Sequence, residues 1–116
     1  MFWLNVVSME IALDAAGIVR SCRASGHAGA GPAGGDVVCA AVSVLARTFV
    51  RVASLQAGVT VRSSALRRGE FALSVDYAEE GRVFLHGAGC FLLEGFKSLA
   101  EEYPEFCVLR VSSLKN

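Results

Sequence analysis

The chain has 116 residues, of which 53% are hydrophobic and 19% are charged. This length and composition predict one folded domain over residues 1–116 and exclude a disordered tail, a collagen or a low-complexity array. Eleven basic residues balance eleven acidic ones, giving a formal net charge of zero, which argues against a dedicated nucleic-acid binder. The mean hydropathy of +0.48 indicates either a rich core or an apolar subunit interface.

The sequence predicts neither a membrane segment nor a signal peptide. No stretch approaches the ~20 apolar residues of a membrane span, and the apolar start at residues 1–7 has no basic region before it. The four cysteines form no Cys-x-x-Cys pair, and His27 and His86 do not show the spacing of zinc ligands. We therefore expect reduced thiols, a cytoplasmic location, and no metal or cofactor.

The first third of the chain is predicted to form a hairpin and a loop. Residues 5–13 alternate between apolar and polar side chains, as a half-buried strand does. Residues 14–17 are typical of a turn, and residues 18–24 are predicted to return as the second strand. Residues 25–35 include five glycines and one proline, which predicts a loop that stays mobile without substrate.

A long helix is predicted next, with Asp36 as its N-cap and Gly58 closing it. Its apolar positions recur at intervals of three and four residues, which indicates one buried stripe. These positions are Val38, Val42, Leu45, Phe49 and Val52.

The second half repeats the pattern of hairpin and helix. Residues 59–63 and 70–77 are predicted to be paired strands, and a helix is predicted from about Arg82 to Tyr103, before Pro104. Residues 107–111 are predicted to be a last short strand. The order β-β-α-β-β-α-β predicts an α+β two-layer sandwich, with a mixed or antiparallel sheet and both helices on one face.

The segment from Gly26 to Ser43 carries the candidate chemistry. Cys39 is predicted to lie in the first turn of the helix, where unpaired N–H groups and the helix dipole favour a thiolate and could bind an oxyanion. His27 could act as its base if the glycine-rich loop folds back. On chemistry alone, however, such residues are more often a packed cysteine, a loop histidine and a capping aspartate than a catalytic pair.

A second motif lies inside the loop. Residues 29–34 match G-x-G-x-x-G between a strand and a helix, which is typical of dinucleotide binding. No acidic residue follows about twenty positions later, and the preceding strand belongs to a hairpin rather than a parallel unit. Nucleotide binding is therefore the weakest of the functional hypotheses.

Two segments resemble the ribosomal-processing cysteine protease family, Prp. The first has Gly-His-Ala, a short loop, and then Asp, two β-branched residues, Cys-Ala and a Ser four residues after the Cys. The matching residues are Gly26, His27, Ala28, Asp36, Val37, Val38, Cys39, Ala40 and Ser43. The second is Leu-Ala-Glu-Glu-Tyr-Pro at residues 99–104.

The resemblance implies a bacterial, cytoplasmic endopeptidase and homodimer that removes the N-terminal extension of a large-subunit ribosomal protein precursor. It implies that Cys39 is the nucleophile, that His27 is the general base and acid, and that Asp36 and Ser43 support them. The implied substrate loop contains the glycines Gly26, Gly29, Gly31, Gly34 and Gly35.

A non-catalytic module that binds the ribosome or RNA remains an alternative. Its basis is a set of arginines in the first part of the chain, two of them on one predicted helix face. These are Arg47, Arg51, Arg62, Arg67 and Arg68. Direct RNA binding is left open, because the zero net charge argues against it.

Overall fold

The computed structural model describes residues 6–26, 33–64 and 70–114, with only the backbone described for 33–36. The elements follow the predicted order β-β-α-β-β-α-β. Their bounds are β1 Val7–Leu13, β2 Val19–Ser25, α1 Ala33–Ser54, β3 Val59–Ser64, β4 Phe71–Tyr77, a short 3-10 helix η2 Glu79–Gly81, α2 Arg82–Glu102 and β5 Cys107–Ser113.

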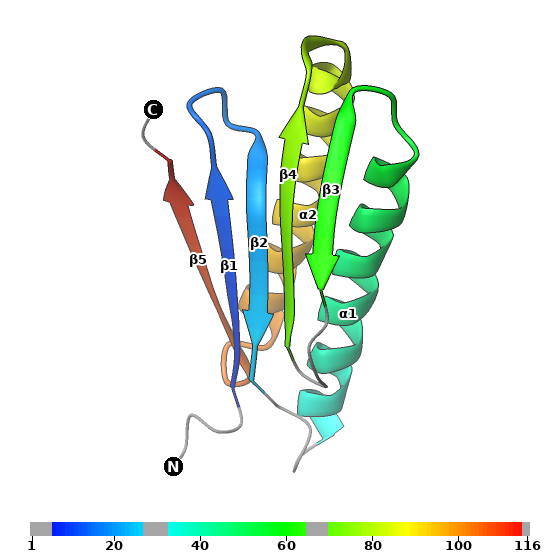
Figure 1. The fold of residues 1–116 in the computed structure, drawn as a ribbon. Helices are drawn as coiled ribbons and strands as arrows, with labels where there is room; N and C mark the ends of the chain where they lie inside the picture. Colours follow the sequence, from blue (N-terminus) through cyan, green and yellow to red (C-terminus); the bar gives the residue numbers. More distant parts are fainter. Residues whose placement is uncertain (1–5, 27–32, 65–69, 115–116) are drawn as a thin grey trace.

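The strands form one mixed sheet in the order β3-β4-β2-β1-β5. β5 pairs parallel with β1, whereas the pairs β1–β2, β2–β4 and β3–β4 are antiparallel. Both helices lie on the same side of this sheet (Figure 1). The predicted α+β class, with a mixed sheet and the two helices on one face, is therefore confirmed.

The core lies between the sheet and the helix layer. Alternate residues of each strand point toward the helices, and every buried side chain in the described part of the chain is apolar. The largest core side chains come from β1, both helices and the segment before β2. They include Met9, Ile11, Ile18, Val38, Phe49, Leu85, Leu92 and Phe96.

Helix α1 differs from the prediction at both ends. It begins at Ala33, so residues 33–35 are helical rather than part of a loop, and Asp36 is the fourth helical residue instead of the N-cap. It ends at Ser54, and Gly58 lies in the turn before β3 with a φ of +79°. An N-cap at Asp36 would start the helix at Val37, four positions after its actual start, and this placed Cys39 too close to the predicted helix start.

The buried stripe of α1 is also rotated relative to the prediction. Val38, Val42 and Phe49 are buried as expected, but Val52 is exposed, and Ala46 and Ala53 take the inward positions. Small side chains therefore occupy these two inward positions of α1. The larger valine is left on the outer surface.

Two glycines of α2 mark close approaches to neighbouring elements. A Cβ on Gly89 would lie 2.9 Å from Cγ2 of Val19 in β2, and a Cβ on Gly95 would lie 3.0 Å from Cδ1 of Leu45 in α1. These close approaches explain why α2 carries glycine at the two positions despite the low helix propensity of glycine.

A polar network fastens the β1–β2 turn to the end of β4. The Asp14 carboxylate accepts hydrogen bonds from the backbone N–H groups of Ala16 and Ile18 and from the Tyr77 hydroxyl, the last at 2.6 Å. Arg20 lies 3.8 Å from the same carboxylate and 5.5 Å from the Tyr77 ring centre. Burial raises the pKa of Asp14, but these hydrogen bonds and the arginine outweigh it and lower that pKa below 3.8.

The prediction that no apolar stretch approaches the length of a membrane span did not take account of part of α1. Residues Val37–Ser54 are long and apolar enough, by length and composition alone, to cross a membrane, with a mean hydropathy of 1.7. Within the fold, the inward side of this stretch packs on the sheet through Val38, Val42 and Phe49. Only 28% of the stretch is buried, so much of its apolar surface faces outward.

Candidate active site

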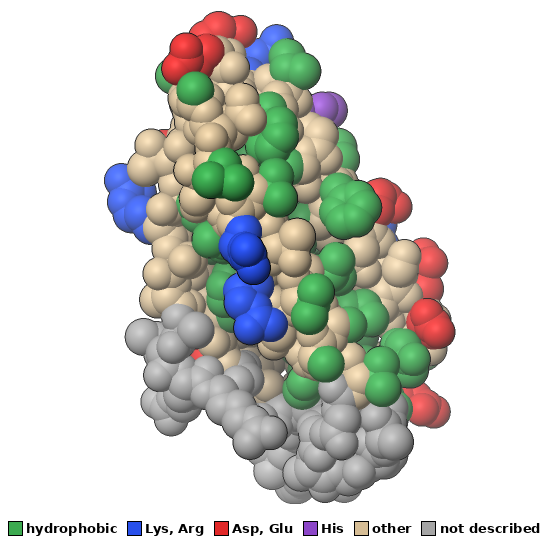
Figure 2. Space-filling model, turned by 90° about the vertical axis from the view of Figure 1, so that its right-hand side faces the viewer, with side chains coloured by type: hydrophobic (Ala, Val, Ile, Leu, Met, Phe, Trp, Pro, Cys, Tyr) green, Lys and Arg blue, Asp and Glu red, His purple; other side chains and the backbone are tan. Residues whose placement is uncertain are grey.

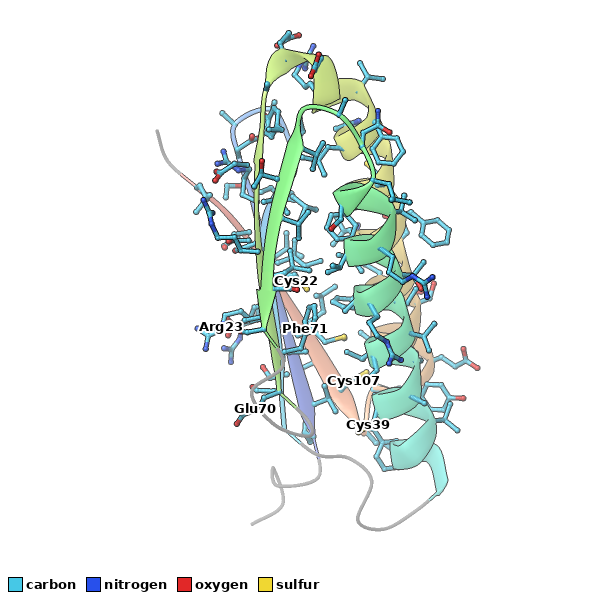
Figure 3. All side chains as sticks on the ribbon, turned by 45° about the vertical axis from the view of Figure 1, so that its right-hand side comes forward. Cys22, Arg23, Cys39, Glu70, Phe71 and Cys107 are labelled. Atoms are coloured by element: carbon cyan, nitrogen blue, oxygen red, sulfur yellow. The ribbon has the colours of Figure 1, made fainter. Side chains whose placement is uncertain are left out.

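Cys39 lies on α1, near the end of the molecule where β2 ends and α1 begins (Figures 1 and 3). Its side chain is half-buried and packs against the edge of the core. Gly26, the described residue next to His27, lies at that same end and has a φ of +104°. A Cβ there would clash with the carbonyl oxygen of Val6, so only glycine fits where the chain leaves β2.

The position of Cys39 in α1 corrects one part of the chemical argument. Cys39 is the seventh residue of the helix, not a first-turn residue. At 1.5 Å per residue it lies about 9 Å along the axis from Ala33, beyond the first turn where the dipole acts strongly. The N–H groups that lack a helical acceptor belong to the first four residues. The helix terminus therefore does not supply the thiolate stabilisation that the sequence suggested for Cys39.

The two predicted supporting residues lie on the same helix as Cys39. Asp36 precedes it by three residues and Ser43 follows it by four, so helical spacing places all three positions on one side of α1. Ser43 is exposed. The structure thus groups these three positions along one helical face.

Of the other predicted site residues, some lie outside the described residues and some lie within them. His27, Gly29 and Gly31 lie outside the described residues, as do residues 27–32 of the loop that was expected to be mobile. Gly34 and Gly35 are in the first turn of α1, which corrects their assignment to a loop.

Burial separates the four cysteines, all of which are thiols. Burial raises the pKa of Cys22 to about 12 and also raises the pKa of Cys107, whose thiol donates a hydrogen bond to the carbonyl of Tyr103 at 3.6 Å. Both sulfur atoms lie between the sheet and the helices (Figure 3). A nucleophile must ionise and reach its substrate, which leaves Cys39 and Cys90 as candidates.

A cysteine–histidine pair on α2 was not predicted from the sequence. Cys90 and His86 are both exposed, and the Cys90 Sγ lies 4.0 Å from Nε2 of His86. The two residues are four positions apart inside a helix that was correctly predicted, and this spacing places side chains on one face. The sequence therefore already carried the signal that brings these two side chains together.

A shallow pocket lies at the same end of the sheet as the end of β2. It has a volume of about 140 Å³ and is lined by the ends of β2 and β3 and the start of β4. Its lining residues are Arg23, Ala24, Ser25, Ser64, Glu70, Phe71 and Ala72. Cys39 is not among them. Arg23 and Glu70 lie on the side of the sheet away from the helices (Figure 3).

The described arginines do not form one basic surface. Arg47 and Arg51 are exposed on α1, on a face where basic and hydrophobic side chains are mixed (Figure 2). Arg62 comes from β3 and binds Asp76 at 3.2 Å. Arg67 and Arg68 lie outside the described residues. This division gives the RNA-binding alternative no geometric support from the described arginines.

Comparisons with known proteins find solved structures that this chain resembles over nearly its whole length. A comparison with functionally curated proteins finds no match. Among solved structures, SMU.848 from Streptococcus mutans has 26% identity and a TM-score of 0.80, over 98% of this chain and all of that one. The ribosomal processing protease Prp from Staphylococcus aureus, solved with a substrate peptide, has 20% identity and a TM-score of 0.73, over 91% and 99% of the two chains.

A second structure of the S. aureus protease holds a covalently linked product peptide and has 20% identity and a TM-score of 0.75, again over 91% and 99% of the chains. The family model described as cysteine protease Prp matches residues 6–108. This match spans both segments on which the resemblance rested. The chain therefore belongs to the cysteine protease Prp family.

Proposed function

We propose that this peptidase acts in the cytoplasm and removes the N-terminal extension of a large-subunit ribosomal protein precursor. The observation that carries the proposal is the position of Cys39. It is one of two cysteines that burial leaves accessible, and it lies in the family motif within the matched residues 6–108. The S. aureus relative, described as a ribosomal processing protease, binds a substrate peptide in its solved complex, which supports the choice of substrate.

The proposed reaction proceeds through a thioester. The Cys39 thiolate attacks the carbonyl carbon of the scissile peptide bond, and the carbonyl oxygen becomes an oxyanion. The C–N bond then breaks, and His27 in its protonated form gives its proton to the leaving amine. Water attacks the thioester while His27 takes one of its protons, which restores the thiolate and releases the extension as a carboxylic acid, whose proton is then lost to solvent.

The supporting roles follow from positions on α1. Asp36 and Ser43 flank Cys39 on one side of the helix, where a carboxylate and a hydroxyl can orient an imidazole or bind the substrate backbone. Gly26 sets the direction in which the chain leaves β2 toward His27, because any side chain there meets the carbonyl of Val6. We propose that the remaining loop glycines, Gly29 and Gly31, let the peptide backbone approach closely.

The chain offers a matched control for each catalytic residue. A peptide spanning the junction between the extension and the mature ribosomal protein is incubated with enzyme in the presence of EDTA, and the products are identified by mass spectrometry. We expect Cys39→Ser and His27→Gln to reduce cleavage to background, because the nucleophile and its base are lost. Cys90→Ser and His86→Gln should retain wild-type cleavage. If Cys90→Ser removes cleavage and Cys39→Ser does not, the assignment of the nucleophile is wrong.

We further propose that the protein is a homodimer that pairs through the outer face of α1. Val37, Val44 and Val52 are exposed there, and Figure 2 shows hydrophobic side chains spread over that face. Exposed apolar surface of this kind favours association. The partner we propose is a second copy, because two α1 faces would each bury the apolar surface of the other.

The test uses two exposed valines on opposite layers. Val44 on α1 is 54% exposed, and Val108 on β5 is 45% exposed on the sheet face away from the helices. We expect Val44→Glu to convert the dimer to a monomer in light scattering after gel filtration, and Val108→Glu to leave the dimer intact. A wild-type monomer, or a dimer that only Val108→Glu disrupts, would contradict this proposal.

A further inference from the structure

The exposed pair of His86 and Cys90 has no role in the proposed reaction or in the fold. Both side chains lie on the outer face of α2, one helical turn apart, and neither belongs to the core. The thiol and the imidazole approach each other, with 4.0 Å between Sγ and Nε2. Two good metal-binding atoms therefore face each other at the surface, where nothing in the packing requires them.

The distance between these atoms fits a shared metal ion. Zinc binds a thiolate sulfur at about 2.3 Å and an imidazole nitrogen at about 2.0–2.1 Å in tetrahedral geometry, which places the two ligand atoms about 3.6 Å apart. The observed separation is 4.0 Å. A small rotation of either exposed side chain closes the difference. The spacing of four residues on one helix face is the same that places two histidines on zinc in His-Glu-x-x-His sites.

The surroundings leave the pair open to an ion. Gly87 lies beside His86, and a Cβ added there would meet no atom within 4 Å. One turn beyond Cys90, Glu94 binds Lys97 at 3.2 Å, so its carboxylate is already engaged. No group of three or more possible ligands exists in the described part of the chain. The protein thus supplies two ligands, and the remaining positions on the ion are left to water or to another molecule.

We propose that His86 and Cys90 form a bidentate site for a thiophilic divalent cation of the zinc class. The cation binds the Cys90 sulfur as a thiolate and the Nε2 atom of His86, and the thiol proton is released to solvent. This site is separate from the proposed catalytic pair of Cys39 and His27 and does not depend on the proposed function. Its thiolate distinguishes it from hard-cation sites, which use oxygen ligands.

The test uses Co²⁺ as a spectroscopic substitute for Zn²⁺. Titrations are carried out on the full chain carrying Cys39→Ser, so that Cys90 is the remaining accessible thiol. We expect a thiolate-to-cobalt charge-transfer band and its displacement by added Zn²⁺. Adding Cys90→Ser should remove the band. Adding His86→Ala should weaken cobalt binding by roughly 10- to 100-fold or more. Losing only an outer-shell partner of a ligand already costs about that much affinity, and here a ligand itself is lost.

Two controls keep the result interpretable. Replacing the exposed Ser98 of α2 by alanine should leave the titration unchanged, and thermal melts without metal should show that every variant is folded. A band that persists in the Cys90→Ser variant would place the cobalt elsewhere and overturn the proposal. A band that needs Cys90 but titrates equally well without His86 would show a single thiol ligand, which refutes the bidentate site.

Discussion

Replacing Gly89 by alanine should destabilise the protein even though alanine is the better helix former. The added methyl group would lie 2.9 Å from Cγ2 and 3.2 Å from Cβ of Val19. Val19 is buried in β2 and has a β-branched side chain fixed to the sheet, so it cannot rotate out of the way. The substitution must therefore move α2 away from the sheet or distort the strand.

The magnitude follows from two opposing effects. Alanine is favoured over glycine in a helix by about 1 kcal/mol, whereas forcing a methyl group into a packed core costs about 1–3 kcal/mol. Gly87 lies one half-turn earlier on the same helix, with nothing within 4 Å of an added Cβ. Gly87→Ala should therefore gain the helix propensity of alanine without any packing cost. The two variants should therefore differ in unfolding free energy by about 1–3 kcal/mol.

The assay is thermal and urea unfolding of both variants beside the wild type. For a domain of this size, about 4 °C of melting temperature corresponds to 1 kcal/mol, so Gly89→Ala should melt roughly 4–12 °C below Gly87→Ala. Gly95→Ala should fall between them, because its contact is with the flexible end of Leu45 at 3.0 Å. If Gly89→Ala melts at or above Gly87→Ala, the close packing of α2 on β2 is wrong.

Two further predictions concern thiol reactivity and acid stability. A limiting thiol reagent near neutral pH should modify Cys39 and Cys90 in the folded protein. Cys22 should react only after unfolding, because burial raises its pKa to about 12. Peptide mapping that finds Cys22 labelled in the native state would contradict its burial. The pKa of Asp14 is lowered below 3.8 in the fold, so its contribution to stability is present above that pH and is lost as the pH falls through the lowered value. Tyr77→Phe removes one of the hydrogen bonds to Asp14. Urea titrations of this variant should show a lower free energy of unfolding at pH 7 and a smaller decrease of that free energy on acidification. An unchanged dependence on pH would count against the network.

Most of the fold could be predicted from the sequence because the strands show period-two alternation. Residues 5–13 and 70–77 alternate, and β1 and β4 are found there within two residues at each end. The error at α1 has a physical cause. Ala33, Gly34 and Gly35 have no strong preference for the first turn of a helix, and Asp36 is a good cap. The sequence rule selected the better capping residue, although the helix starts three residues earlier.

The candidate site was found by motif and not by physical pattern. The helix dipole was expected to favour a thiolate at Cys39, but the structure places this residue in the second turn. The complete burial of Cys22 depends on how the helices pack on the sheet, which the sequence pattern does not give. In contrast, the pairing of His86 with Cys90 needed only the four-residue spacing inside α2 and was overlooked.

The parallel pairing of β1 with β5 has a consequence for the order of folding. Val7 and Cys107 face each other across this pair although 100 positions of chain separate them. Closing so long a loop costs conformational entropy that local contacts do not offset. The two hairpins can form early, but one side of β1 lacks its partner strand until the last strand has been synthesised. Until then, that edge of β1 is open to pairing with another molecule.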